Sequence, residues 1–286
     1  MFFSSLDELL LQRIDELDEF TRKTLHLASV LGKTFSLMEI IGISEHVSSI
    51  VEDGRKSHTD KLRRSLDVAV EEGILDEYLP DKVDDSPFHV DNFYIRATSE
   101  AKGEVVDTKI HDVLQQEDLY FTFSHDTWRQ KILSLLLDAY KQDIHKHAAS
   151  SLEAKIPDII MADYRTKMRL FAHLKGSGNC FKAADLAVNI GKGFVYLGLN
   201  RQSIRVYDEA LDMWRKNIDN NCDNCCGLSS SECIAGISPE MVELLDESDL
   251  TSVVKLLTAS GQALGTLSKK EESARAFEDA LDVSLR

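Results

Sequence analysis

The first 35 residues contain two stretches in which apolar side chains recur every three or four positions. The first stretch carries Leu6, Leu9, Leu10, Ile14 and Leu17. After a break near Asp18, the second carries Leu25, Ala28 and Leu31 and ends at Gly32-Lys33-Thr34. This spacing places each set on one face of a helix, so we predict two amphipathic helices.

Two more helices are expected before residue 74. Ser36 is suited to start a short helix through Met38 and Ile41, because its hydroxyl can accept a backbone N–H. Thr59 or Asp60 is expected to cap the next helix. The residues that this helix turns inward are Leu62, Leu66, Ala69, Val70 and Gly73.

Two short segments have the composition of β-strands. Residues 74–78 follow the preceding helix, and Tyr120–Phe123 are aromatic apart from one threonine, which favours a pleated strand. We expect them to pair as a two-stranded ribbon. Residues 80–118 between them are rich in Asp and Glu and are expected to form an enlarged, solvated loop. Three helices followed by such a ribbon is a winged-helix layout.

A Ser-His-Asp triplet follows the second strand. Ser124 or Asp126 is a suitable helix N-cap, and apolar residues recur at helical spacing from 128 to 152, which predicts one long helix. His125 is therefore expected at the start of that helix, where backbone N–H groups favour anions. We expect no catalytic triad, because three consecutive residues cannot converge as nucleophile, base and orienting acid.

The last part of the chain contains an internal repeat with spacings of twelve, four and three residues. The two copies are Gly191, Ser203, Tyr207 and Ala210, and Gly261, Ser273, Phe277 and Ala280. In tetratricopeptide repeats (TPRs) a small residue lets two helices approach, and an aromatic side chain fills the space. We therefore predict a TPR-like α-helical solenoid that binds a partner protein.

The net charge of the chain limits the kinds of partner that it is expected to bind. The net charge of −16 makes nucleic acid an unlikely partner, because non-specific binding needs clustered Lys and Arg. Lys61, Arg63 and Arg64 would be the recognition cluster of a DNA-binding winged helix, but several acidic residues on the same helix dilute them. Those acidic residues are Asp60, Asp67, Glu71 and Glu72.

Length and hydropathy fit a cytoplasmic, helix-rich protein of two domains. The chain has 286 residues, 43% of them hydrophobic, and four prolines, whereas a single core rarely exceeds about 250–300 residues. No run approaches the roughly 18 apolar residues of a membrane span. The N-terminus lacks the basic region of a signal peptide, so we expect no membrane partner.

A cysteine-rich loop is expected at 217–237, inserted between the repeats. Its cysteines are Cys222, Cys225, Cys226 and Cys233. A Cys-x-x-Cys pair can supply half of a zinc site. The remaining spacing is poor, and adjacent cysteines rarely both bind one ion. A polar loop that tolerates cysteines is the simpler interpretation, so we predict no metal site.

A phosphate-binding loop is missing from the sequence. Gly32-Lys33-Thr34 imitates the end of one, but Leu27 stands where the first glycine would be. We assign Gly32 to helix termination and Lys33 to the carboxyl end of the helix dipole.

Taken in order, these segments resemble the winged-helix portion of STAND signalling ATPases. The segments that carry the resemblance are Leu11-Gln-Arg-Ile-Asp-Glu-Leu, Leu25 to Phe35, and Phe123-Ser-His-Asp with a following helix that contains Tyr140 and His147. The branch it resembles comprises AAA-type ATPase modules joined to class III adenylate or guanylate cyclases and to TPR tails. The likeness covers residues 6–35, 59–78, 120–215 and 255–283.

The resemblance implies regulation by nucleotide. In that family the winged helix closes over ADP bound to a preceding P-loop domain, and a histidine in a Met-His-Asp-like triplet touches the phosphates. Ser124-His125-Asp126 matches the triplet with serine for methionine. His125 would then be the nucleotide-phosphate sensor, and a role in the capping turn is the alternative. ADP or ATP would be bound by the parent protein with an upstream ATPase domain, and this chain would hold no cofactor of its own.

The predicted organisation has three parts. They are a lid-type helix at 1–17, a winged-helix domain at 18–158 with the acidic insert at 80–118, and TPR-like repeats at 159–286. The ATPase and cyclase domains of the family are missing, which suggests a truncated gene product or a fragment. We expect a mainly α, non-catalytic regulatory and protein-interaction module. The alternatives are an ATP-binding or cyclase-linked signalling protein at full length, and a DNA-binding regulator.

Overall fold

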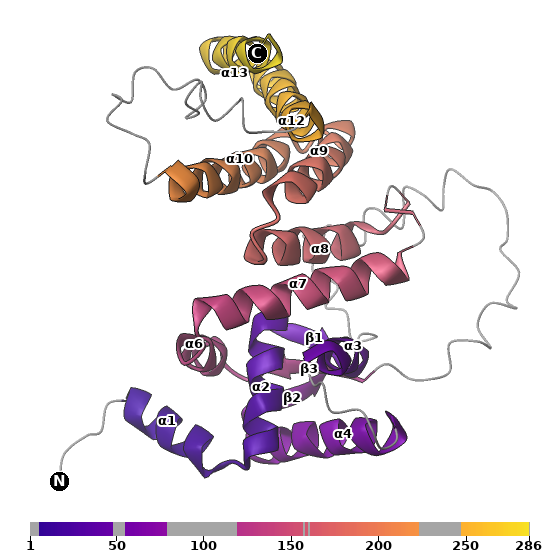
Figure 1. Cartoon of the computed structure of the whole chain (residues 1–286), viewed down its shortest axis with the longest axis vertical. Coiled ribbons are helices and arrows are strands. Elements are labelled where there is room, and N and C mark those ends of the chain that lie inside the picture. The colour runs from indigo at the N-terminus through magenta and orange to yellow at the C-terminus, as the bar shows by residue number, and fades with distance from the viewer. Residues whose placement is uncertain are drawn as a thin grey trace, which may run out of the picture. The chain divides into compact units, whose positions relative to one another are not determined.

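The computed structural model describes residues 6–47, 55–78, 119–156, 158–159, 161–222 and 247–285. These residues are mainly helical, with eleven helices and one three-stranded antiparallel sheet. The chain divides into two compact units, Met1–Lys155 and Ile156–Arg286 (Figure 1). The predicted boundary lies slightly later, and the acidic insert lies outside the described residues.

The first unit begins with two helices, α1 (Leu6–Glu16) and α2 (Glu19–Leu31). The predicted break near Asp18 is confirmed. Asp18 is the N-cap of α2, and its Oδ1 accepts the N–H groups of Phe20 and Thr21 at 2.9 and 3.1 Å. At the other end Gly32 adopts φ 139°, a conformation that favours glycine. Its N–H donates to Ala28 O, which confirms that Gly32 terminates the helix.

The sheet has three strands, one more than predicted. β2 (Leu75–Tyr78) and β3 (Tyr120–Phe123) form the expected antiparallel pair. β1 (Thr34–Ser36) pairs with the other edge of β3, so the strand order is β1-β3-β2. β1 was missed because three residues are too few to show a period of two. It places Phe35 against the rings of Phe121 and Phe123, with centroids about 6 Å apart.

Two helices connect β1 to β2. Ser36 does start α3 (Leu37–Val47). Its Oγ accepts the Glu39 N–H, and Glu39 Oε2 accepts the Ser36 N–H at 2.8 Å, which is a capping box. The expected cap of the next helix at Thr59 or Asp60 is wrong, because α4 (Arg55–Glu71) begins earlier. His58 already lies inside α4, where its Nε2 is 3.1 Å from Ser44 Oγ of α3.

The predicted long helix after β3 is two helices, α6 (Asp126–Ser134) and α7 (Asp138–Lys155). The break falls on three consecutive leucines. Leu136 is buried, whereas Leu135 is 45% exposed and Leu137 is 79% exposed. The apolar spacing continues through this turn, which explains the error. α2 packs against α3, α4, α6 and α7 and is therefore the central helix of the first unit.

The second unit consists of helices alone in its described part. They are α8 (Tyr164–Gly176), α9 (Cys180–Tyr196), α10 (Asn200–Cys222), α12 (Glu247–Thr266) and α13 (Lys270–Ser284). α9 packs against α10, α12 packs against α13, and α12 also packs against both α9 and α10. The cysteine-rich loop was predicted to begin at 217, but α10 continues to Cys222.

The repeated glycines lie where the paired helices approach. A methyl group built on Gly191 of α9 would stand 2.2 Å from Cε1 of Tyr207 of α10. A methyl group on Gly261 of α12 would stand 3.1 Å from Cζ of Phe277 of α13. The predicted contact between a small residue and an aromatic one is therefore confirmed in both pairs. Ser273 Oγ adds a buried hydrogen bond to Gly261 O at 2.8 Å.

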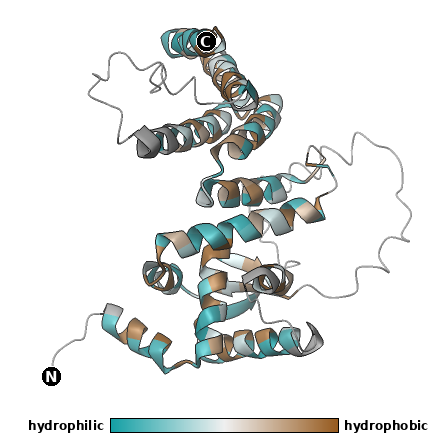
Figure 2. Ribbon diagram, in the orientation of Figure 1, coloured by the Kyte–Doolittle hydropathy of each residue, from teal (hydrophilic) through white to brown (hydrophobic). Residues whose placement is uncertain are grey.

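Hydrophobic and hydrophilic residues share each helix, as expected where one face is buried (Figure 2). The core of the first unit lies between the sheet and its helices. Within the described part of the chain, no helix has the length and hydropathy to span a membrane.

Candidate functional site at the strand-helix junction

The junction between β3 and α6 is tied to the turn between α4 and β2. Ser124 Oγ donates to Gly73 O at 2.7 Å and also lies 3.1 Å from Ile74 O, and the Ser124 N–H donates to Ile74 O. The prediction that Ser124 or Asp126 caps the helix is therefore wrong. The Ser124 hydroxyl instead contacts backbone carbonyl groups about 50 residues earlier in the chain. No local sequence pattern predicts such a contact.

His125 is the N-cap residue of α6. Its backbone is extended, with φ −134° and ψ 142°, and its side chain makes no capping hydrogen bond. The imidazole is exposed, while the His125 carbonyl accepts the Trp128 N–H at 3.1 Å. The side chain is therefore presented to solvent beside a helix N-terminus, where the backbone carries partial positive charge.

Asp126 is the first residue of α6 and is engaged within its own helix. Its Oδ2 accepts a hydrogen bond from Gln130 Nε2 at 2.5 Å, and its Oδ1 lies 4.0 Å from an Arg129 guanidinium nitrogen. Arg129 Nε also donates to Ser29 O of α2 at 2.9 Å. Asp126 thus places a negative charge beside His125, which stabilises the helix dipole but opposes a bound anion.

The pairing of β1 with β3 brings Lys33 to the same end of the sheet. The Phe123 N–H donates to Lys33 O at 3.0 Å, so the Lys33 backbone lies beside the last residue of β3. The Lys33 side chain is exposed. The sequence assigns this lysine only to the carboxyl end of the helix dipole. Three residues, Thr34-Phe35-Ser36, are too few to show strand alternation, so the sequence holds no usable signal for placing Lys33 beside β3.

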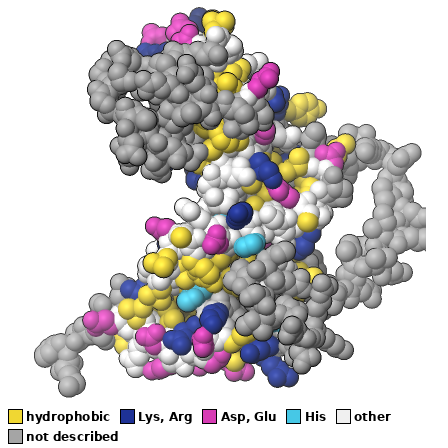
Figure 3. All heavy atoms as spheres, in the orientation of Figure 1, with side chains coloured by type: hydrophobic (Ala, Val, Ile, Leu, Met, Phe, Trp, Pro, Cys, Tyr) yellow, Lys and Arg dark blue, Asp and Glu magenta, His cyan; other side chains and the backbone are white. Residues whose placement is uncertain are grey.

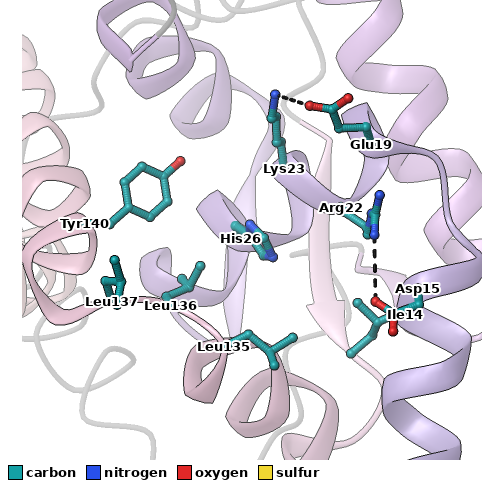
Figure 4. Close-up of a pocket in the computed structure, with 10 residues that line it drawn as sticks. All are labelled: Ile14, Asp15, Glu19, Arg22, Lys23, His26, Leu135, Leu136, Leu137 and Tyr140. Carbon is teal, nitrogen blue, oxygen red and sulfur yellow. Dashed lines mark ion pairs between the residues drawn. The ribbon is translucent and has the colours of Figure 1, made fainter.

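A separate pocket of about 480 Å³ lies between α1, α2 and the turn from α6 to α7 (Figure 4). Its lining residues are Ile14, Asp15, Glu19, Arg22, Lys23, His26, Leu135, Leu136, Leu137 and Tyr140. His125 is not one of them. His26 and Tyr140 face the pocket from α2 and α7, with the three leucines along one side. The same face of the first unit shows a hydrophobic patch with histidines at its edges (Figure 3).

The charged groups of this pocket are paired. Arg22 lies 3.7 Å from Asp15 Oδ1, and Lys23 Nζ lies 2.6 Å from Glu19 Oε1. Burial, and then the Arg22 charge, lower the pKa of His26, so its imidazole is neutral at pH 7. Burial raises the pKa of Tyr140, against the opposing effect of Lys23. The pocket offers hydrogen-bonding groups beside an apolar wall, and its ten lining residues contain no activated nucleophile.

Among the residues that the structure describes, no group of three or more His, Cys, Asp or Glu side chains could hold a metal ion. Cys222 is the last residue of α10, and the side chains of Cys222, Cys225, Cys226 and Cys233 lie outside the described structure. Cys180 is buried and is not part of a disulfide bond.

The side chains of Lys61, Arg63 and Arg64 on α4 are exposed, as a DNA-reading helix would require. Lys61 Nζ lies 4.2 Å above the ring of Phe20. That contact directs the Lys61 charge toward α2. Comparison with family models, curated proteins and solved structures gives no match for this chain.

Proposed function

We propose that the first unit is a winged-helix domain. The order of α2, β1, α3, α4, β2 and β3 is helix, strand, helix, helix, strand, strand, and the sheet order is β1-β3-β2. This order supports the winged-helix assignment more strongly than the two-stranded ribbon predicted from the sequence did.

The winged helix would act as a nucleotide sensor for a P-loop domain that is not in this chain. The observation that carries this proposal is the exposed His125 at the N-cap of α6, with no side-chain cap. A phosphate there would meet an imidazole and the helix N-terminus. Lys33 would supply a cationic group at the same end of the sheet. The chain itself would be non-catalytic, with ADP or ATP bound mainly by the missing domain.

Because ADP would be held mainly by the missing domain, this chain should bind it only weakly. Anisotropy of a fluorescent ADP analogue at high protein concentration therefore tests this assignment with three variants. His125→Ala should weaken binding by at least threefold, because it removes the imidazole donor. Asp126→Asn should strengthen binding, because it removes a negative charge beside the phosphates. His147→Ala on α7 is the matched control and should have no effect. Equal affinities for wild type, His125→Ala and Asp126→Asn would contradict the sensor role.

The second unit would be a TPR-like scaffold that binds a partner protein. Its support is the repeated contact between a helix glycine and an aromatic residue, Gly191 with Tyr207 and Gly261 with Phe277. Stacked helix pairs of this kind present extended surfaces to other proteins.

A DNA-binding role is the second candidate, favoured by the exposed Arg63 and Arg64 on α4. The net charge of −16 opposes it. A gel-shift assay at low salt separates the two proposals. We expect no sequence-specific complex. A complex that Arg63→Ala with Arg64→Ala abolishes would favour the DNA-binding role instead.

A further inference from the structure

The pocket between α1, α2 and the turn from α6 to α7 has a continuous apolar side (Figure 4). Leu135, Leu136 and Leu137 form that side, and Ile14 of α1 is a fourth apolar lining residue. Leu136 is buried, but Leu135 and Leu137 are largely exposed and so offer apolar surface to a ligand. The volume of about 480 Å³ lies within the range of roughly 300–1,000 Å³ that is typical of small-molecule sites.

His26 and Tyr140 supply the uncharged polar groups of the pocket. Both side chains are partly buried and face the cavity from α2 and α7. Within the described part of the chain, no protein group makes a hydrogen bond to either ring. Burying a polar group is costly unless it is hydrogen-bonded. A ligand could therefore gain hydrogen bonds from the Tyr140 O–H and from one imidazole N–H of His26.

Four charged side chains also line the pocket, and their charges sum to zero. Lys23 and Glu19 pair at 2.6 Å and are 65% and 74% exposed. Asp15 is 74% exposed as well, whereas Arg22 is only 36% exposed. The 3.7 Å between the Arg22 and Asp15 atoms is longer than a hydrogen bond. Arg22 is therefore the least exposed of the four charges and has N–H groups to donate to a ligand.

The two polar rings respond to the positive charges of the lining. Burial, and then the Arg22 charge, lower the pKa of His26. Burial raises the pKa of Tyr140, and the Lys23 charge opposes that rise. The charges that act on these rings are thus both cations, although the lining as a whole is neutral. An anionic group beside the rings would be attracted by the same cations.

We propose that this pocket binds a small carboxylic acid with an apolar body, such as a medium-chain fatty acid. The carboxylate would accept hydrogen bonds from Arg22 and from the His26 imidazole, and the apolar body would lie against the three leucines. A guanidinium suits a carboxylate because it can donate two parallel N–H groups to it. His125 does not line this pocket, so the proposal is independent of nucleotide sensing.

Three probes separate the parts of such a ligand. Octanoate has a carboxylate and an apolar body, octan-1-ol lacks the charge, and acetate lacks the apolar body. In NMR titrations of the full chain, followed at the His26 imidazole, octanoate should bind saturably. Its affinity should be at least fivefold higher than that of octanol and at least tenfold higher than that of acetate. Bound octanoate should also raise the pKa of His26, because a nearby anion favours the imidazolium, whereas octanol should not.

Two variants of the full chain test the two sides of the pocket. Arg22→Gln should weaken octanoate binding at least fivefold and leave octanol binding within about twofold, because only the partner of the carboxylate is lost. A folding defect would weaken both. Leu137→Asn should weaken both probes, with unchanged helical circular dichroism because this side chain is 79% exposed. Arg201→Gln, at an exposed arginine of α10, is the matched control and should bind like wild type.

Three results would overturn the proposal. The first is the absence of saturable octanoate binding. The second is an equal affinity for octanoate and octanol, or octanoate binding that Arg22→Gln leaves unchanged, because the carboxylate would then have no partner in the pocket. The third is a set of NMR shifts that omits His26 and Tyr140, which would place the ligand elsewhere.

Discussion

Gly191 and Gly261 occupy equivalent positions but have different room for a side chain. Tyr207 stands against Gly191 and is almost fully buried, whereas Phe277 stands against Gly261 with 41% of its surface exposed. A buried ring is held by its surroundings and cannot move aside, while an exposed ring can. The same substitution should therefore have different effects at the two sites.

We predict that Gly191→Ala destabilises the second unit by up to about 2 kcal/mol. Overpacking costs roughly 1–3 kcal/mol, and the better helix propensity of alanine offsets about 1 kcal/mol. Gly261→Ala should lie between neutral and about 1 kcal/mol more stable, because Phe277 can shift. Urea unfolding followed by circular dichroism measures both. Equal destabilisation by the two substitutions would contradict this account of the glycines.

His145 of α7 is a second residue whose surroundings set a measurable property. Burial, and then the Arg129 charge, lower its pKa to about 4. In the unfolded chain His145 has an ordinary histidine pKa near 6.5. Between about pH 4 and 6.5 its imidazole is therefore protonated in the unfolded chain but not in the folded one. Stability contributed by neutral His145 is present above about pH 6.5 and is lost as the pH falls toward 4.

The titration of His145 can be followed by NMR through its Cε1–H signal, with a midpoint expected near 4. His145→Gln should reduce the loss of stability between pH 6.5 and 4 relative to wild type. A midpoint near 6.5, or an identical pH dependence in the variant, would show that the imidazole is not desolvated.

At the scale of elements, the sequence predicted most helices and the β2-β3 pair because their signals are local. Five apolar positions mark α1, and Tyr120–Phe123 is an aromatic strand. The repeat in the second unit was found from glycine and aromatic spacing alone. Two errors at this scale have different causes. β1 depends on pairing with β3, 88 residues away at Thr34 and Thr122. The split of α6 from α7 is hidden by continuous apolar spacing.

The candidate site was predicted in position but not in detail. His125 does lie between β3 and α6, as local composition indicated. Ser124 is anchored by hydrogen bonds to the carbonyl groups of Gly73 and Ile74, and His125 is the N-cap residue instead. No local pattern in the sequence reveals these distant contacts. The placement of Lys33 beside β3 was missed with β1.

The start of α2 provides a test at the element scale. Asp18→Ala should destabilise the first unit by about 1 kcal/mol, because it removes the acceptor for the N–H groups of Phe20 and Thr21. Hydrogen bonds from Thr21 lower the pKa of Asp18, so its contribution should be lost in acid. Asp15→Ala on α1 is the control, at a side chain with one long ion pair. Equal effects of the two substitutions in urea unfolding would argue against the cap.

At the scale of the whole molecule, each unit contains one tryptophan. Trp128 belongs to the core of the first unit, and Trp214 is fully buried in the second. Single-tryptophan variants, with phenylalanine at the other site, can therefore report the unfolding of each unit. We predict that Gly191→Ala shifts the Trp214 transition and leaves the Trp128 transition in place, and that Asp18→Ala does the reverse. Identical shifts at both tryptophans would contradict a division into two compact units.

The most direct test of the account is an NMR titration of the full chain with ADP, because it locates the phosphate contact. We predict that the His125 imidazole signals and the amides of Thr127 and Trp128 at the start of α6 shift together and saturate. Adenosine without phosphates should leave them unchanged. Shifts confined to other residues, or equal shifts with adenosine, would contradict phosphate sensing at the β3-α6 junction.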